Sequence, residues 1–225
     1  MNRLKRSPSQ PVEAQFQVTS ILHGRCPMNP HDGTNNRPET LIIITPNRTG
    51  WDDMEALEAI KSVKSVSKFK PDPVPEQKVQ AVMNAARFAQ SSENLQPWKF
   101  IVVSDEDTKR KLAGACTNSK HMADAPLVVV ACARLDEAVA MIGGYMNSYP
   151  VDLGMALANV TVAATSEGLG TSWIFAFNEE KVKSSLKIPA DVRVVGLTPI
   201  GIPEAYAPPA GRKHLSEILS YNAYE

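Results

Sequence analysis

The chain has 225 residues, of which 43% are apolar and 21% are charged, as expected for one good-sized domain with a core of its own. Lys and Arg together number 24, and Asp and Glu also number 24, so the formal net charge is zero. A neutral chain gives no electrostatic reason to expect nucleic acid or an anionic membrane as a partner.

The cysteines argue against both a disulfide scaffold and a metal site. Cys26, Cys116 and Cys132 are odd in number, widely spaced and without a CxxC pair. We therefore expect reduced thiols in a cytoplasmic protein and no bound metal. No apolar run reaches the roughly 18 residues that a membrane span needs. The basic residues 1–6 are not followed by the apolar stretch of a secretory signal.

Residues 1–50 differ in composition from the rest of the chain. They are rich in Pro, Asn, Ser and Thr, and residues 41–44 form their one apolar run. We predict a largely disordered extension with one short extended piece, and a folded domain over residues 51–225. The basic bias of the extension leaves an organelle transit peptide open as an alternative reading, and Met54 could serve as an internal start.

From residue 52 the pattern is that of regular structure. Apolar residues at helical spacing predict helices at 54–63, capped by Asp52 or Asp53, and at 79–90, joined by a proline-stiffened connector. Further helices are predicted at 105–115, at 151–167 and, capped by Asn178, at 179–187. Apolar runs predict strands at 99–104, 127–133, 173–177 and 192–202, the last interrupted by Pro199. The irregular alternation indicates an α+β fold with one central sheet surrounded by helices.

The segment Ser-Ser-Glu-Asn-Leu-Gln-Pro-Trp at residues 91–98 is a candidate binding loop. It places short polar side chains between a helix and a buried strand, where hydroxyl and amide groups can bind a phosphate or a polyol chain. The alternative is an ordinary polar turn in front of a core residue, Trp98.

Three other clusters each allow a functional and a plain structural interpretation. Lys61, Lys64, Ser65, Ser67 and Lys68 could hold a phosphate or could form a solvated helix end. The two glycines of residues 167–174 permit close approach of a ligand or simply stop a helix. Residues 212–214 (Arg-Lys-His) could clamp a phosphate or lie free on the surface.

Several common catalytic motifs are missing from the sequence. It contains no GxGxxG after a strand, no GxxxxGK[ST], no GxSxG and no HExxH. These absences argue against a dinucleotide-type Rossmann site, a P-loop kinase, a serine hydrolase and a zinc protease. Any demanding chemistry would therefore have to come from a cofactor.

Taken in order, these segments resemble the nitroreductase family of FMN-dependent enzymes. The strongest match is residues 91–103, followed by 65–77, 124–131, 151–174, 200–203 and 212–218, which together cover about the last three quarters of the chain. The resemblance implies an α+β fold with a central, mostly antiparallel sheet. It also implies a homodimer built along the helix at 151–167, with FMN in the interface and the chain end wrapped around the partner.

The resemblance also implies residue roles. Ser91, Asn94 and Gln96 would contact the flavin and its ribityl chain. The backbone at Phe175 and Ala176 would approach the flavin N5 edge. The phosphate end would be bound by Ser65 together with Lys64, Ser67, Arg212 and Lys213.

The chain departs from the family pattern at the phosphate and ring contacts. Val63 and Ser67 stand where the family usually has arginines, and Lys64 or Lys68 is a candidate to compensate. Phe175-Ala176 replaces a Gly-Gly pair and could narrow the pocket over the ring.

The resemblance implies a ping-pong oxidoreductase. NADH or NADPH would reduce FMN, and a small acceptor of nitroaromatic or quinone type would then take the electrons. Alternatives are another flavin chemistry on the same fold, such as reductive dehalogenation or flavin fragmentation, a non-catalytic flavin-binding or sensor protein, and an interaction module that has lost FMN.

Overall fold

The computed structural model describes residues 56–117, 119, 121–208 and 210–224, and the backbone of two short strands, β1 (Phe16–Thr19) and β2 (Ile43–Pro46). β1 and β2 pair antiparallel, and the chain divides into two compact units, Met1–Asp53 and Met54–Glu225. Most of the extension predicted for residues 1–50, Met54 and the caps predicted at Asp52 and Asp53 lie outside the described residues.

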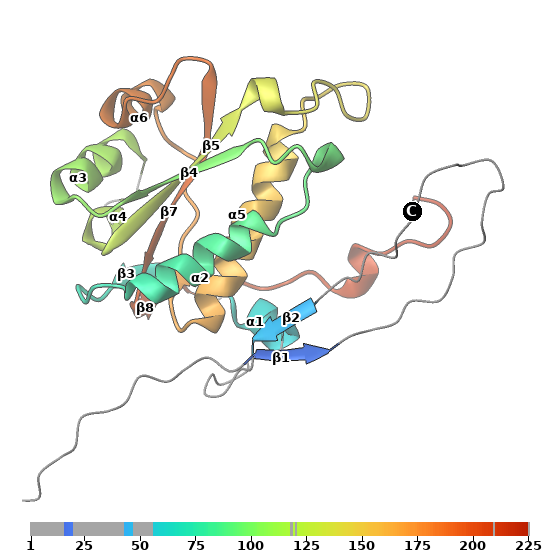
Figure 1. The fold of residues 1–225 in the computed structure, drawn as a ribbon, viewed down its shortest axis with the longest axis horizontal. Helices are drawn as coiled ribbons and strands as arrows, with labels where there is room; N and C mark the ends of the chain where they lie inside the picture. Colours follow the sequence, from blue (N-terminus) through green and yellow to red (C-terminus); the bar gives the residue numbers. More distant parts are fainter. Residues whose placement is uncertain are drawn as a thin grey trace, which may run out of the picture. The chain divides into compact units, whose positions relative to one another are not determined.

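One antiparallel sheet lies at the centre of the second unit (Figure 1). Its order is β4 (Trp98–Val103), β5 (Leu127–Arg134), β7 (Val192–Gly201) and β6 (Gly170–Thr171). The registers pair Trp98 with Ala133 and Leu127 with Ile200. This arrangement confirms the α+β fold with a central antiparallel sheet.

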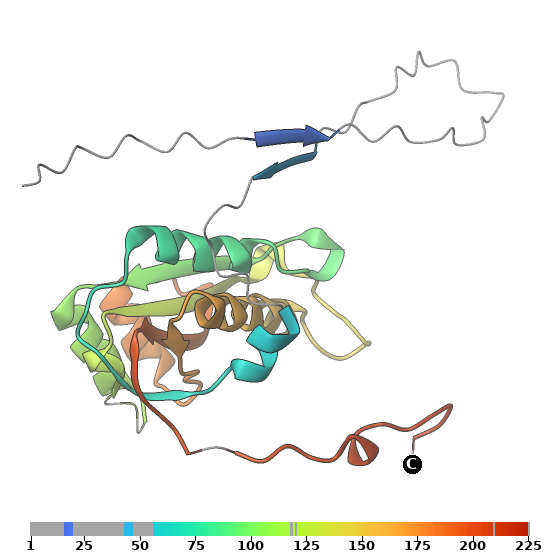
Figure 2. The same cartoon turned by 90° about the horizontal axis from the view of Figure 1, so that it is seen from below.

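Helices cover both faces of the sheet. Successive side chains of β5 point to opposite faces, and because nearly all of them are apolar and buried, both faces need a covering layer. On one side Val129 packs with α2 (Glu76–Arg87) and α5 (Tyr149–Ser166). On the other side Val130 packs with α3 (Glu106–Ala115) and α6 (Glu179–Leu186). Figures 1 and 2 show these layers, with α2 and α5 side by side.

A second, two-stranded sheet flanks the first. β3 (Val66–Phe69) and β8 (Pro203–Tyr206) pair antiparallel, with irregular register around Ser67. α1 (Ala56–Ser62) precedes β3 and contacts α5, and the short α4 (His121–Asp124) lies between α3 and β5. Three short 3-10 turns complete the described elements: Ser92–Asn94, Leu135–Glu137 and Leu215–Glu217.

Two sequence predictions about strands are wrong. The strand expected at 173–177 is reduced to β6 at Gly170–Thr171 and to isolated bridges at Ile174 and Phe177. Trp173 and Phe175 pack on each other at the surface, so this apolar run is not a buried strand. β7 is also not interrupted at Pro199, which stands opposite Val128 in the pairing of β7 with β5.

The helix at 151–167 begins two residues earlier than predicted and is the longest described helix (Figure 1). Its buried side is apolar apart from Asp152 and Thr161. Among the described residues, no helix combines the length and hydropathy needed to cross a membrane.

Candidate functional site

The loop at residues 91–97, between α2 and β4, has an unusual backbone. Glu93, Asn94 and Gln96 have φ values of 53°, 57° and 52°, in the left-handed region that residues other than glycine seldom adopt. Such conformations cost on the order of 1–3 kcal/mol each and persist where the surroundings impose them, often at functional sites.

Hydrogen bonds hold this loop in place. The Gln96 N–H donates to the Ser91 hydroxyl at 3.0 Å. The backbone N–H and the hydroxyl of Ser92 both donate to Oδ1 of Asp152 in the first turn of α5, at 2.8 and 3.0 Å. The side chains of Asn94 and Gln96 stay exposed and line a recess of about 370 Å³ with Arg87, Phe88 and Ala89. The loop therefore presents amide groups to a ligand from a fixed backbone.

A second group of predicted residues lies where α1 leads into β3. Ser65 pairs with Thr171 in an isolated parallel β-bridge. The Ser65 carbonyl accepts from the Ala207 N–H at 2.8 Å. The Lys64 ammonium lies 5.6 Å from the centre of the Tyr206 ring and lines a small cavity of about 250 Å³. Lys64 is thus an exposed cation directly beside an exposed serine.

The other lysine considered for this role is already engaged. The Lys68 ammonium donates to Glu204 at 2.6 Å, and this hydrogen bond raises the pKa of Lys68. Ser67 is exposed within the irregular part of β3. Lys64 is therefore the better candidate for contact with an anion.

A third group is the segment that follows β6. The Trp173 indole N–H donates to Thr161 of α5 at 2.6 Å, and the Phe175 ring meets the Trp173 ring edge-on at 5.4 Å. Phe175 is 56% exposed. Within the described residues, the N–H groups of Phe175 and Ala176 have no hydrogen-bond acceptor, whereas the Ala176 carbonyl accepts from Thr117. Two donors beside an exposed ring suit a planar ligand with acceptor atoms on its edge.

Arg212 and Lys213 are not brought to the other groups. Both are exposed in the segment after β8, and the Arg212 guanidinium contacts the carbonyls of Ala210 and Gly211 at 3.3 Å. In Figure 2 this segment runs away from the sheet and helices.

The first two groups lie near opposite ends of α5. The loop at 91–97 is bonded to Asp152, whereas the cavity beside Lys64 is lined by Thr165 and Gly168. At 1.5 Å per residue, Asp152 and Thr165 are about 20 Å apart along the helix. A single small ligand on one chain cannot readily contact both groups, although each group is suited to binding.

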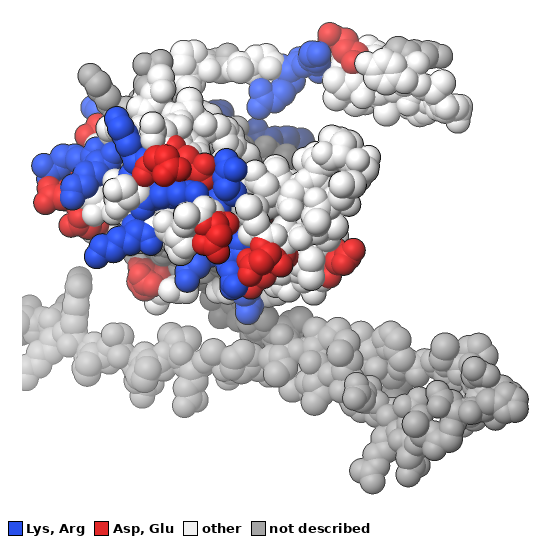
Figure 3. Space-filling view, turned by 90° about the horizontal axis from the view of Figure 1, so that it is seen from above, with Lys and Arg blue, Asp and Glu red and all other residues white. Residues whose placement is uncertain are grey.

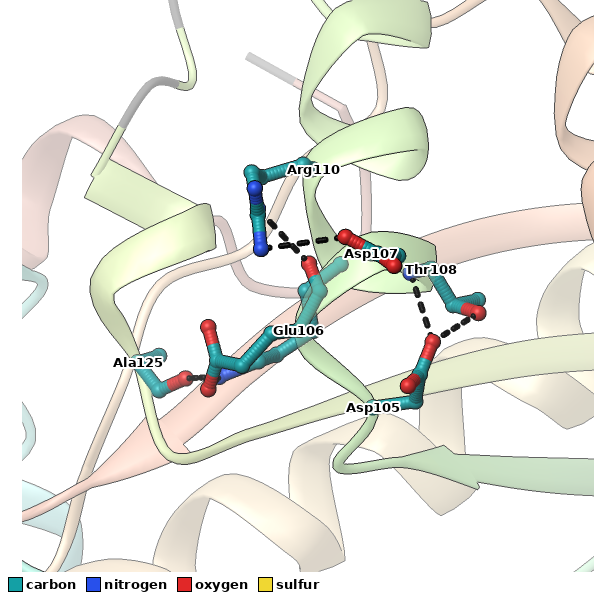
Figure 4. Close-up of polar contacts among 7 residues, drawn as sticks. Asp105, Glu106, Asp107, Thr108, Arg110 and Ala125 are labelled. Atoms are coloured by element: carbon teal, nitrogen blue, oxygen red, sulfur yellow. Dashed lines mark hydrogen bonds and ion pairs between the residues drawn. The ribbon is translucent and has the colours of Figure 1, made fainter.

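Charged side chains also gather away from these three groups on the one face that Figure 3 draws. In Figure 3 the Lys, Arg, Asp and Glu side chains gather mainly over α3 and α6. The cluster at the start of α3 is structural: Figure 4 shows Asp105 accepting from the N–H and hydroxyl of Thr108, and Arg110 paired with Asp107. Among the described residues there is no group of acidic, His or Cys side chains that could hold a metal ion.

Sequence reasoning missed Asp152 and Tyr206, and it included Thr171 in the cluster at 167–174 without giving it a role. Asp152 is 1% exposed, and the one available signal was a lone acid in a helix otherwise rich in alanine and valine. The contacts of Thr171 and Tyr206 depend on pairings between distant segments, which have no local signature.

Comparison with known proteins gives a consistent result. The profile of the Nitroreductase family matches residues 60–150 and 116–202. A protein named NADH dehydrogenase from Thermus thermophilus is 27% identical over 195 residues, which cover 74% of this chain and 95% of that protein. The FMN reductase [NAD(P)H] of Bacillus subtilis is 27% identical over 164 residues, covering 66% of each chain.

A solved structure supports the same assignment. The crystal structure of a nitroreductase family protein from Clostridium novyi NT matches with a TM-score of 0.64 and 38% identity, covering 67% of this chain and 86% of that one. Because the family profile covers more than half of the sequence and the fold agrees, the chain belongs to the nitroreductase family.

Proposed function

We propose that the protein is an FMN-dependent oxidoreductase that passes electrons from NADH or NADPH to a small acceptor of nitroaromatic or quinone type. One observation carries the proposal: two exposed groups of predicted flavin contacts lie about 20 Å apart along α5. A ligand bound between two antiparallel copies of the chain would meet one group from each copy. The choice of a nicotinamide as reductant and of FMN is supported by the names of two relatives, the NADH dehydrogenase of Thermus and the FMN reductase [NAD(P)H] of Bacillus.

The homodimer is part of this proposal. A two-fold axis across α5 would bring the loop at 91–97 of one copy towards Lys64 and Ser65 of the other, and would form two equivalent sites. The outer side of α5 carries exposed Val151, Met155 and Ala158 and no charged residue after Asp152. Such an uncharged, mostly apolar stripe suits contact with the same helix of a second copy.

Each group has a role that follows from its chemistry. The Lys64 ammonium and the Ser65 hydroxyl suit the phosphate, with Ser67, Arg212 and Lys213 as further contacts. Ser91, Asn94 and Gln96 offer hydroxyl and amide groups to the ribityl chain and ring edge. The N–H groups of Phe175 and Ala176, which have no acceptor among the described residues, suit the N5 edge.

FMN, when bound, supplies the redox chemistry by accepting a hydride and passing on electrons. The residues around it orient the ring, exclude water and present fixed N–H dipoles towards its edge, so the chain needs no general base. Donor and acceptor would use the same exposed face in turn, which gives ping-pong kinetics. We propose a cytoplasmic location because Cys116 and Cys132 are free thiols.

A second candidate function is that of a flavin-binding protein that does not catalyse electron transfer from a nicotinamide. The Phe175 ring lies against β7, where a Cβ added at Gly196 would be 3.0 Å from its Cε1 atom. This ring stands beside the N–H groups proposed to face N5, so it could limit the space for a nicotinamide. The replacement of two family arginines by Val63 and Ser67 favours the same candidate.

An absorbance spectrum before and after addition of NADH without oxygen separates these candidates. The oxidoreductase predicts a yellow protein whose flavin absorbance bleaches with NADH or NADPH and returns on addition of a nitroaromatic or quinone. Flavin absorbance that neither nucleotide can bleach would support the non-catalytic candidate. A colourless protein that also fails to bind added FMN would refute both.

A further inference from the structure

We propose that Asp152 is a positioning residue for the flavin site, and that it acts through Ser92. Its carboxylate would fix the backbone of the loop at 91–97 before any ligand arrives. This inference rests on the proposed function for its ligand, but its structural half concerns the protein without FMN.

The burial of Asp152 is costly and needs a reason. The residue is 1% exposed, and its Oδ2 atom is buried without a hydrogen-bond partner in the described part of the chain. Its neighbours on the buried side of α5, Leu153 and Ala156, are apolar. An apolar residue would occupy the same position without desolvating a charge, although the positive end of the helix dipole offsets part of that cost.

The hydrogen bonds to Asp152 hold the residue at which the loop enters its left-handed conformation. Ser92 directly precedes the left-handed residues Glu93 and Asn94, and Gln96 follows shortly after. Both donors of Ser92 end on the same carboxylate oxygen, at 2.8 and 3.0 Å. Releasing Ser92 would allow these residues to return to ordinary φ values, which would turn Asn94 and Gln96 away from the recess that they line.

A loop that is already in its binding conformation loses less entropy when the ligand binds, so losing the clamp should weaken FMN binding. Asp152 does not need to touch the flavin for this effect. Its contribution should appear in affinity and in loop dynamics.

The chain contains a matched control for a purely structural role. Asp105 accepts the same pair of bonds: the N–H and the hydroxyl of Thr108 both donate to its Oδ1 atom, at 2.8 and 2.6 Å (Figure 4). That pair caps α3, and none of its contacts involves the loop at 91–97. Removing it should affect folding without affecting FMN affinity.

The experiment compares wild type, Asp152→Ala, Asp152→Asn, Ser92→Ala and Asp105→Ala. FMN dissociation constants are measured by quenching of flavin fluorescence, and amide hydrogen exchange of residues 91–96 is measured in the apoproteins. Asp152→Ala should raise the dissociation constant about tenfold and speed exchange at Ser92, because two hydrogen bonds to a charged group are lost. Asp152→Asn keeps an acceptor oxygen for Ser92 and should stay within about threefold of wild type.

The possible outcomes are distinct. Asp105→Ala should melt earlier but bind FMN as wild type does; an equal loss of affinity in that variant would reduce Asp152 to a general stability role and overturn the inference. Asp152→Ala with wild-type affinity and wild-type exchange would also overturn it.

If Asp152→Ala does not fold, Ser92→Ala decides: we expect binding about threefold weaker, and unchanged binding contradicts the clamp. Wild type that binds no FMN refutes the proposed function, while the exchange data still test the clamp.

Discussion

Gly170 lies where the two sheets meet, and the backbone there leaves no room for a side chain. A Cβ at this position would be 2.2 Å from Val66 Cγ2 and 3.2 Å from Pro203 Cγ. Val66 is 1% exposed, so it has little freedom to move. The close approach keeps β6 beside β3, and therefore keeps Thr171 bridged to Ser65.

Gly170→Ala should lower the free energy of unfolding by about 1–3 kcal/mol, the usual cost of an overpacked core. The measurement is chemical denaturation of the apoprotein. Gly114→Ala is the control, because no atom lies within 4 Å of a Cβ there and alanine favours a helix. It should be neutral or stabilising by up to about 1 kcal/mol. Equal stability of the two variants would mean that Val66 can move aside.

The two described thiols should be unreactive in the folded protein. Burial raises the pKa of Cys116 and of Cys132 to about 11, so almost no thiolate is present near neutral pH. In a Cys26→Ser background, which removes the thiol outside the described residues, we expect slow reaction with a disulfide reagent at pH 8. Urea should accelerate the reaction strongly. Fast reaction of two thiols without urea would contradict the burial.

At the scale of elements, Glu179 joins the start of α6 to β7. Its carboxylate accepts from the Val194 N–H at 2.9 Å and from Arg193 at 3.0 Å. Burial pushes the pKa of Glu179 upwards, but these hydrogen bonds and the positive charge of Arg193 outweigh it, so the pKa is lowered overall. Protonation would therefore weaken the junction between helix and strand.

A lowered pKa in the folded state fixes the sign of the pH effect. The ionised Glu179 stabilises the fold above the ordinary glutamate pKa of about 4.3, and this contribution is lost as the pH falls through the lower folded value. Glu179→Gln should cost about 1 kcal/mol of unfolding free energy at pH 7, and the difference from wild type should shrink below about pH 4. Unfolding curves at pH 7, 5 and 3.5 test this, and a constant difference would contradict it.

The elements that could be predicted from sequence are those with local signals. The cap predicted at Asn178 is confirmed in α6, and the helix predicted at 105–115 is α3, where Asp105 is the cap rather than the first helical residue. The run at 173–177 was misassigned because the period of apolar residues does not distinguish a buried strand from two aromatic rings packed at the surface. The pairing of β3 with β8 joins segments more than 130 residues apart, and no local pattern encodes it.

The candidate site likewise has features that a local sequence pattern predicts and features that it does not. The polar loop at 91–97 was recognisable because its residues are consecutive, and the family resemblance gave them roles that remain predictions. The clamp from Asp152 to Ser92 was not recognisable, since it joins residues 60 positions apart in the sequence. The separation of the loop from Lys64 along α5 depends on the fold as a whole.

At the scale of the whole molecule, one chain leaves apolar side chains uncovered. The segment after β8, which Figure 2 shows running away from the sheet, carries three exposed apolar residues. They are Leu215 at 62%, Ile218 at 66% and Tyr221 at 76%. On the body, Leu57 and Ile60 of α1 are 68% and 55% exposed. Apolar surface on this scale usually marks an interface, and burial of these two regions is what the proposed dimer predicts.

Met155 offers a direct test of the dimer. It is 37% exposed on the outer side of α5, between the exposed residues Val151 and Ala158. Met155→Glu would leave a carboxylate exposed in a monomer but would desolvate it, unpaired, in a dimer built along α5. We therefore expect Met155→Glu to be a folded monomer in light-scattering chromatography, with FMN binding weakened at least about tenfold, because each site then lacks the contacts of the second copy. Lys111→Glu, on the charged surface of α3, is the control for added negative charge and should remain dimeric and bind FMN normally. A monomeric Met155→Glu that binds FMN as tightly as wild type would mean that one chain forms the whole site, and a Met155→Glu that stays dimeric would move the interface away from α5.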